Sequence, residues 1–233
     1  NGSAKNNVIL KNEAPCSHNF SPFLDTNPAA LPAARYKALA GTSNSGLVAF
    51  VSADGIHWKR ARQKAVISRG AFDSQNVSFW SESEELYLCY FRTWDGPTPW
   101  SGFRSISRVT SKDFLSWSEP RAMSYGGTPR EHLYTNQTQP YFRAPHIYLS
   151  VAARFMPGRR ILTPAQAKAI DVDPGYFSDC SDAVLMSTRG GTLYSRTFMD
   201  AFIRPGPGLE NWVSRTNYPA LGIVGMQGGR LAM

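Results

Sequence analysis

The sequence predicts an all-β chain made of repeated antiparallel sheet modules. Three segments share one layout, an apolar strand followed by a turn and an aromatic residue: 47–58, 106–117 and 183–194. Asp54-Gly55 and Gly190-Gly191 within these segments are typical of tight β-hairpins, because such turns need a positive φ. A polar-rich strand and an apolar strand precede each hairpin, which makes four strands per module. Modules that recur every roughly 55–75 residues in this way are typical of β-propeller blades.

Each module is read in the order polar-rich strand, apolar strand and hairpin. The polar-rich strands are expected at 19–25, 73–80 and 135–142, and the apolar strands at 35–39, 86–91 and 147–151. A fourth module begins at 211–212 and continues through 217–224, with no room for its remaining strands before Met233. The stretch 165–170 is weakly helical, and we place it in an insertion between strands.

These modules predict an incomplete propeller domain with about three blades and the start of a fourth. The expected blades are residues 1–68, 69–123 and 124–205, followed by a partial blade at 206–233. A propeller closes by pairing its last blade with its first, and an open apolar edge is an aggregation hazard. The chain is then either a fragment or borrows a strand edge from another copy, and we expect a fragment of a longer single domain.

The charge of the chain narrows the classes of partner. The formal net charge is +8, which could attract nucleic acid, anionic membranes or acidic polysaccharides. The Lys and Arg residues are scattered, and the only tight clusters are 59–62 and 159–160. Zinc-finger spacing, a basic helix and ribonucleoprotein-type aromatic motifs are all missing, so we expect no nucleic-acid partner. An anionic glycan is kept as a candidate partner.

The cysteines and the apolar runs argue against a disulfide framework, a metal cluster and a membrane partner. Cys16, Cys89 and Cys180 are far apart and odd in number, which argues against a disulfide framework and against a metal cluster. Cys89 stands in an apolar run and is expected to be a buried thiol. The longest apolar runs are strand-length, far below the roughly 18–20 residues that span a bilayer, so we expect no membrane partner.

The most visible acidic residues are expected to build turns rather than a site. Asp54 and Asp113 each follow a serine by two residues within the hairpin turns. Aspartate in this position hydrogen-bonds nearby backbone N–H groups. The candidates for chemistry therefore lie elsewhere.

Polar residues on the first strand of each module are the candidates, because the innermost strands of a propeller line a solvent-filled funnel. Asp25 ends the first of these strands and Asp73 opens the second. The third has no carboxylate, but Glu131 leads directly into it.

Three motifs around these residues resemble a known superfamily. They are His18-Asn19-Phe20 with Asp25-Thr26-Asn27-Pro28, then Phe72-Asp73-Ser74-Gln75-Asn76, then Glu131-His132-Leu133-Tyr134-Thr135-Asn136-Gln137. They look like the glycosidase-like five-bladed β-propellers related to glycoside hydrolase families 32 and 43, over nearly the whole chain. The resemblance implies an incomplete five-bladed propeller that cleaves a glycosidic bond in a poly- or oligosaccharide. It implies Asp25 as base or nucleophile, Asp73 as the residue that positions sugar hydroxyls and tunes pKa values, and Glu131 as general acid.

The resemblance also leaves a second candidate for the acid. The acid of that superfamily usually stands in a Glu-x-Pro context, whereas Gln139-Pro140 occupies that kind of place here. Asp182, before the hairpin strand of the third module, is the alternative candidate for the general acid. The residues expected to bind substrate are His18, Asn19, Gln75, Asn76, His132, Asn136, Arg143 and Asp182.

Glycosidic cleavage needs a protonated acid at the leaving oxygen and an ionised carboxylate on the other face of the sugar. A catalytic reading therefore requires Asp25, Asp73 and Glu131 or Asp182 within roughly 10 Å of one another at one mouth of the funnel. A non-catalytic glycan-binding propeller and a purely structural propeller are the alternatives. We expect no cofactor, although a calcium ion on the propeller axis could be accommodated, and no resident metal is required. A secreted or periplasmic location is expected, although no signal peptide is visible at Asn1–Lys5.

Overall fold

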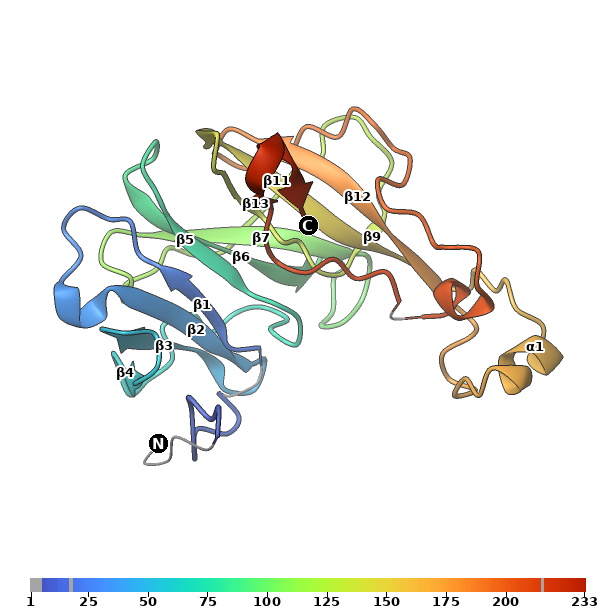
Figure 1. Cartoon of the computed structure of the whole chain (residues 1–233), viewed down its shortest axis with the longest axis horizontal. Coiled ribbons are helices and arrows are strands. Elements are labelled where there is room, and N and C mark those ends of the chain that lie inside the picture. The colour runs from blue at the N-terminus through green and yellow to red at the C-terminus, as the bar shows by residue number, and fades with distance from the viewer. Residues whose placement is uncertain (1–5, 17–18, 215) are drawn as a thin grey trace. The chain divides into compact units, whose positions relative to one another are not determined.

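The computed structural model describes residues 6–16, 19–214 and 216–233, and it confirms the all-β prediction. Three four-stranded antiparallel sheets account for most of the regular structure, together with a short two-stranded ribbon (Figure 1). The chain divides into two compact units. Unit 1 comprises Asn1–Thr93 and Ile106–Ala122, and unit 2 comprises Trp94–Ser105 and Met123–Met233.

The first sheet follows the predicted order of polar-rich strand, apolar strand and hairpin. Its strands are paired in chain order as β1 (Ser21–Leu24), β2 (Tyr36–Thr42), β3 (Gly46–Ser52) and β4 (Lys59–Arg60). The short 3-10 helix η1 (Pro32–Ala34) lies between β1 and β2. This is the strand order of one propeller blade.

The second sheet repeats that order. Its strands are β5 (Val77–Ser81), β6 (Leu86–Trp94), β7 (Arg104–Ser111) and β8 (Arg121–Ala122), again paired in chain order. The sheet belongs mainly to unit 1, while the ends of β6 and β7 at Trp94 and Arg104–Ser105 belong to unit 2.

The third sheet departs from the prediction at its first strand. The strand expected over 135–142 is broken into β9 (His132–Leu133) and β10 (Gln139–Tyr141), and both pair with β11 (Ala144–Met156). β11 pairs in turn along nine residues with β12 (Cys180–Thr188). The last arm of the third hairpin is reduced to an isolated bridge between Ser187 and Ser195.

The insertion between β11 and β12 holds the predicted helix, α1 (Pro164–Ala169). Thr163 and Gln166 form a reciprocal capping box at its N-terminus, and Pro164 occupies the first helical position, where it costs no hydrogen bond. Ala167 packs the helix against Leu162 and Val213. These local signals explain why a six-residue helix forms at all.

The expected start of a fourth module is only partly regular. The segment 217–224 carries strand structure at Val224 alone, where β13 (Val224–Gly225) begins and pairs with β14 (Leu231–Ala232). The 3-10 helices η2 (Leu209–Trp212) and η3 (Gln227–Gly229) fill much of the remainder. The stretch lacks strong alternation of apolar and polar residues, so nothing in it favours a long strand. Closure of a five-bladed ring stays a prediction.

Alternate residues of β2 face two different cores in unit 1, as the two-residue period of a strand requires. Leu39 packs into a cluster with Phe72 and Phe91, all fully buried. Ala38 and Ala40 face the opposite side and pack with Phe50. Each fully buried phenylalanine contributes roughly 1.5–3 kcal/mol, so these clusters hold the first two sheets in place.

The turn role of the hairpin aspartates is confirmed. Asp54 Oδ1 accepts the backbone N–H groups of Ile56 and His57 at 2.9 and 2.8 Å. Asp113 Oδ1 does the same for the residues two and three positions after it, at 2.8 and 2.7 Å. The Trp58 indole N–H then donates to the carbonyl of Gly55, which has a positive φ. The second turn places Phe114 in that left-handed conformation instead of glycine.

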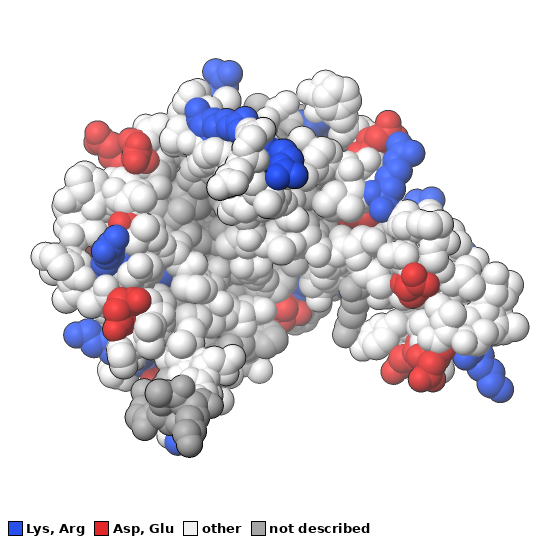
Figure 2. All heavy atoms as spheres, in the orientation of Figure 1, with Lys and Arg blue, Asp and Glu red and all other residues white. Residues whose placement is uncertain are grey.

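The three cysteines are buried and free, as expected for Cys89. Burial raises the pKa of the Cys89 thiol, which keeps it protonated and unreactive. No helix in the described part of the chain is long and apolar enough to cross a membrane. Basic and acidic side chains are interspersed on the face shown in Figure 2.

Candidate functional site

Asp25 lies in a closed ion pair in unit 1. Its side chain is 0% exposed and pairs with the ammonium group of Lys37, which is itself 8% exposed. The Tyr87 hydroxyl donates to the same carboxylate oxygen at 2.8 Å, and the backbone N–H of Asn27 donates to the other at 3.0 Å. Burial, and then the hydrogen bond to Asp25, raise the pKa of Tyr87 well above its usual range. Both oxygens of Asp25 are thus satisfied by protein groups.

Asp73 is placed differently, on the surface ahead of β5. Its side chain is 45% exposed and pairs with Arg92, whose side chain is only 2% exposed. The side-chain amides of Asn19 and Asn76 both donate to the carbonyl of Phe72, at 3.0 and 3.3 Å. The first two predicted motifs therefore meet beside Asp73.

The structure does not bring Asp25 and Asp73 together. Tyr87, which contacts Asp25, stands near the start of β6, and Arg92, which contacts Asp73, stands near its end. At about 3.3 Å per residue, the two positions are roughly 17 Å apart along the strand. The reason is that Asp25 follows its inner strand, whereas Asp73 precedes its own. The groups that hold the two carboxylates thus lie at opposite ends of β6.

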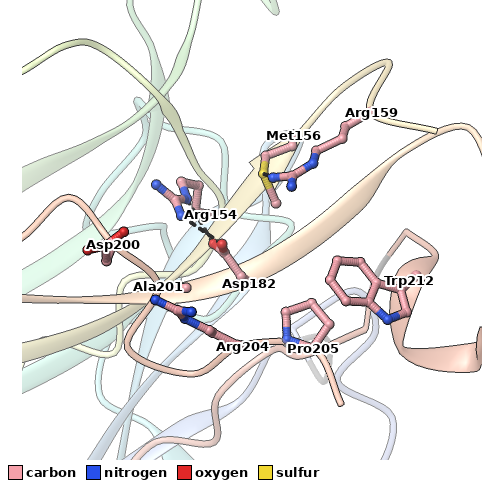
Figure 3. Close-up of a pocket in the computed structure, with 9 residues that line it drawn as sticks. All are labelled: Arg154, Met156, Arg159, Asp182, Asp200, Ala201, Arg204, Pro205 and Trp212. Atoms are coloured by element: carbon pink, nitrogen blue, oxygen red, sulfur yellow. Dashed lines mark hydrogen bonds and ion pairs between the residues drawn. The ribbon is translucent and has the colours of Figure 1, made fainter. Parts of the chain in front are cut away.

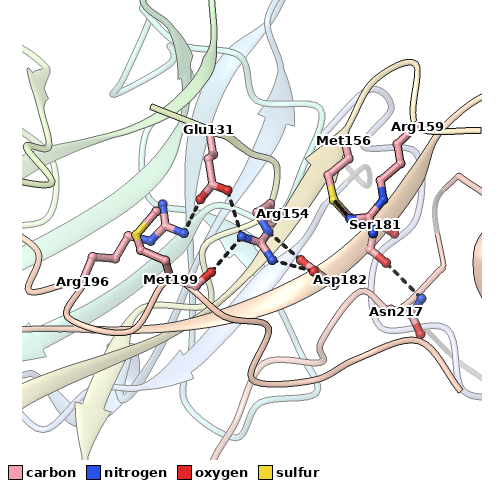
Figure 4. Close-up of polar contacts among 9 residues, drawn as sticks. All are labelled: Glu131, Arg154, Met156, Arg159, Ser181, Asp182, Arg196, Met199 and Asn217. Carbon is pink, nitrogen blue, oxygen red and sulfur yellow. Dashed lines mark hydrogen bonds and ion pairs between the residues drawn. The ribbon is translucent and has the colours of Figure 1, made fainter. Parts of the chain in front are cut away.

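Glu131 stands at the start of the third sheet in unit 2 and joins a cluster of charged groups (Figure 4). Its Oε1 accepts a hydrogen bond from Arg154 Nη1 at 2.8 Å, and its Oε2 pairs with Arg196. The Arg196 side chain is 1% exposed, while that of Glu131 is 25% exposed. Glu131 is thus the accessible member of this contact.

Asp182 belongs to the same cluster. Arg154 Nε and Nη2 donate to its two carboxylate oxygens at 2.8 and 2.7 Å, which is the bidentate geometry of a strong arginine–carboxylate pair. Arg154 Nη1 also donates to the Met199 carbonyl at 2.9 Å. The hydrogen bonds to Asp182, followed by the charges of Asp182 and Glu131, raise the pKa of Arg154 above its usual range despite burial. We name Glu131, Arg154, Asp182 and Arg196 the charge cluster.

A pocket of about 290 Å³ adjoins the charge cluster (Figure 3). Arg154 and Asp182 line it from neighbouring strands, since they are paired in the register of β11 and β12. The other lining residues are Met156, Arg159, Asp200, Ala201, Arg204, Pro205 and Trp212. The view shows Asp200 and Trp212 on opposite sides of the pocket, with Asp182 between them. Carboxylates, guanidinium groups and an indole ring are groups that bind sugar hydroxyls and pack on sugar rings.

The other predicted binding residues that the structure describes contact protein groups outside the charge cluster. His132 accepts the backbone N–H of Arg104 on Nδ1 at 3.1 Å, and burial, then the charge of Arg104, lower the pKa of His132. Asn136 is buried and accepts the backbone N–H of Thr138 at 2.9 Å. Arg143 is exposed and donates to the Gly229 carbonyl at 3.2 Å. Gln75 is partly buried beside Asn76. His18 lies outside the described residues.

The sequence analysis did not identify the arginines that pair with the predicted carboxylates. Arg92 and Arg154 each stand in an otherwise apolar strand and are almost buried. A buried charge needs a partner of opposite sign, so an arginine within such a run indicates a carboxylate nearby. That signal points to Asp73 in one sheet and to Glu131 and Asp182 in the other.

The acidic groups that the structure describes are not arranged as a metal centre. Within residues 6–16, 19–214 and 216–233, no group of three or more His, Cys, Asp or Glu side chains is arranged to hold a metal ion. The carboxylates of the charge cluster are bonded to guanidinium groups instead.

No protein-family model matches the chain, and no curated protein matches its sequence. Among solved structures, the chain is similar to an N-acetylgalactosamine deacetylase from F. plautii, determined in complex with blood group B trisaccharide. The TM-score is 0.45 and the identity 12%, over 74% of this chain and 49% of that one. The chain thus spans about half the length of that structure, and a likeness this distant carries no argument about function. The relationship to glycoside hydrolase families 32 and 43 stays a prediction.

Proposed function

We propose that this chain is a carbohydrate-active protein that hydrolyses a glycosidic bond, with Glu131 and Asp182 as its working carboxylates. The observation that carries the proposal is that one guanidinium group, that of Arg154, binds both carboxylates at the edge of a pocket. The pocket also has the indole ring of Trp212 in its wall. All of these residues belong to unit 2.

The spacing of the two carboxylates suits the reaction. Both groups bond nitrogens of a single planar guanidinium, so their nearest oxygens lie within roughly 8 Å of each other. Glycosidases hold their two carboxyl groups about 5–5.5 Å apart for retention and about 6.5–9.5 Å apart for inversion. This upper bound overlaps both ranges, so the spacing of the two carboxylates is compatible with either outcome.

The two carboxylates differ in access, which suggests their roles. Glu131 is the more exposed, at 25% against 6% for Asp182. We assign Glu131 as general acid, the role that the resemblance implies, because the acid must reach the leaving oxygen of a chain. Asp182 faces the pocket and is held rigidly by its bidentate bond to Arg154. We assign Asp182 as the ionised carboxylate of the pair.

The two remaining predicted carboxylates belong to unit 1 and have no part in the proposed site of unit 2. Asp73 is exposed ahead of its own sheet and pairs with Arg92. Asp25 has no exposed side-chain surface and no free oxygen. A sugar could reach Asp25 only after the ion pair with Lys37 had broken, so the proposed mechanism does not use it. The proposal therefore replaces the three-carboxylate set expected from the resemblance by the pair Glu131 and Asp182.

Glycan binding without cleavage is the second candidate function. The observation that favours it is that all four oxygens of Glu131 and Asp182 accept hydrogen bonds from guanidinium groups. An acid in this state must release an arginine before it can donate a proton. A pocket that keeps these bonds would bind a sugar without hydrolysing it.

A hydrolysis screen on a panel of poly- and oligosaccharides tests the proposal. We expect Glu131→Gln and Asp182→Asn each to lower turnover by about 10²–10⁴-fold, because each removes a proton-transfer or charge-stabilising group. Asp171→Asn is the matched control, since Asp171 is an exposed aspartate of the same unit. Thermal melting of each variant separates loss of catalysis from loss of folding.

The outcomes separate the two candidate functions. Turnover that survives in both folded variants would overturn the assignment of the carboxylates. Glycan binding by the wild-type chain without turnover, weakened by Asp182→Asn, would establish the binding function instead.

A further inference from the structure

We infer that the pocket beside the charge cluster takes a saccharide that carries an acidic group, a uronic acid or a sulfate ester, with Arg204 as its anchoring cation. The inference rests on the proposed function and names the class of sugar. It follows from a count of the charges that line the pocket and of the bonds that already neutralise them.

The charge cluster is neutral by itself. Arg154 and Arg196 supply two positive charges, and Glu131 and Asp182 supply two negative charges. Every carboxylate oxygen in the cluster accepts a bond from one of these two guanidinium groups. The cluster therefore leaves no charge to attract a ligand.

The rest of the pocket carries an excess of positive charge. Arg159 and Arg204 line it together with a single further carboxylate, Asp200. Within the part of the chain that the structure describes, no carboxylate pairs with either arginine. Arg159 donates instead to the sulfur of Met156, at 3.0 Å. One guanidinium charge thus remains uncompensated even if Asp200 pairs with the other.

A planar guanidinium recognises carboxylate and sulfate oxygens through two parallel N–H donors. Arg204 and Trp212 both line the pocket together with Asp182 (Figure 3). An acidic pyranose ring would place its anionic group on Arg204 and its apolar face toward the indole ring. The volume of about 290 Å³ is near the lower limit of small-ligand pockets, roughly 300–1,000 Å³. This size suits a single sugar unit.

Calorimetric titration of the full chain tests this inference with three probes. They are a uronic acid oligosaccharide, the same oligosaccharide with its carboxyl groups reduced to alcohols, and a sulfated neutral oligosaccharide. We expect at least one acidic probe to bind ten or more times more tightly than the reduced one. We expect higher salt to weaken the binding of that probe, because ions screen exposed charges.

Three variants test which arginine the affinity for the acidic probe depends on. Arg204→Gln should lower the affinity for the acidic probe to that for the reduced probe, and Arg159→Gln should lower it by a smaller factor. Arg189→Gln is the matched control, because Arg189 is an exposed arginine of the same unit outside the pocket. It should leave the affinity unchanged.

Equal affinity for the acidic and reduced probes would overturn the inference, as would failure of both acidic probes to bind. An unchanged affinity in folded Arg204→Gln would also overturn it. The proposed function is judged separately. Turnover of a neutral glycan that depends on Glu131 and Asp182 would uphold the hydrolase while this inference failed. Binding of only one acidic probe would tell a carboxylate from a sulfate ester.

Discussion

The buried carboxylate of unit 1 and that of unit 2 pair with different cations, and the two cations make different numbers of bonds. Asp25 pairs with Lys37, and Asp182 pairs with Arg154. Both acids are nearly inaccessible, with side chains 0% and 6% exposed. Each cation comes from a neighbouring strand, β2 in one case and β11 in the other.

The difference lies in how many bonds the cation can make. The lysine ammonium is a compact charge that pairs with Oδ2 of Asp25, an oxygen that it shares with the Tyr87 hydroxyl, and the other oxygen accepts a backbone N–H. The guanidinium of Arg154 has donors on three nitrogens and binds Asp182, Glu131 and a carbonyl at once. Lys37 therefore holds one carboxylate, whereas Arg154 joins two carboxylates at a pocket. Lys37 and Tyr87 also line a pocket, of about 580 Å³, but Asp25 itself is not among its lining residues. A buried ion pair by itself does not indicate a functional site.

The largest expected effect is on the stability of unit 1. Asp25→Ala leaves the ammonium group of Lys37 buried without a partner, so we expect the free energy of unfolding to fall by about 3–5 kcal/mol. Urea denaturation measures the change. The double variant Asp25→Asn with Lys37→Met should recover part of it, because both charges are then gone. A loss below about 1 kcal/mol would show that the pair is not closed to solvent.

A smaller loss of stability, with a clear loss of function, is expected in unit 2. Arg154→Lys keeps the charge but cannot hold two carboxylates bidentately. We expect the free energy of unfolding to fall by about 1–3 kcal/mol and glycan turnover to fall at least tenfold. Denaturation and the hydrolysis screen give the two values. If Arg154→Lys turned over glycan as fast as the wild type, the Arg154 pair would be no more important for function than the Asp25 pair.

The smallest expected effect is the contribution of an exposed carboxylate, that of Asp113, to the free energy of unfolding. Partial burial opposes the shift, but the backbone N–H groups of Ser116 and Leu115 lower the pKa of Asp113 from 3.8 to about 2. An unfolded chain therefore binds more protons at this group, and its contribution is present above pH 4 and lost as the pH falls toward 2. After allowance for solvent screening the contribution is at most about 1 kcal/mol.

Melting temperatures between pH 2 and pH 6 test this value against Asp113→Asn. The asparagine keeps the accepting oxygen and loses the titration, so its melting temperature should depend less on pH than that of the wild type. Parallel curves for the two proteins would show that the turn gains nothing from the charge.

Much of the local structure could be predicted from the sequence. The hairpin turns at Asp54 and Asp113 and the helix α1 form where expected, because their hydrogen bonds join residues two or three positions apart. The strands of the first two sheets follow their apolar runs. The weakly patterned segments, at the first strand of the third sheet and near the C-terminus, departed from the prediction.

The sequence by itself determined the all-β fold, its repeated sheets and the turn role of the most visible aspartates. Only the tertiary structure decided which carboxylates are accessible and which cations hold them. Arg154 is 23 positions from Glu131 and 28 from Asp182, and Tyr87 is 62 positions from Asp25. Pairings at such separations depend on which strands are neighbours. The hydrophobic pattern of one strand constrains its register, but it does not identify the distant segment that will pair with it.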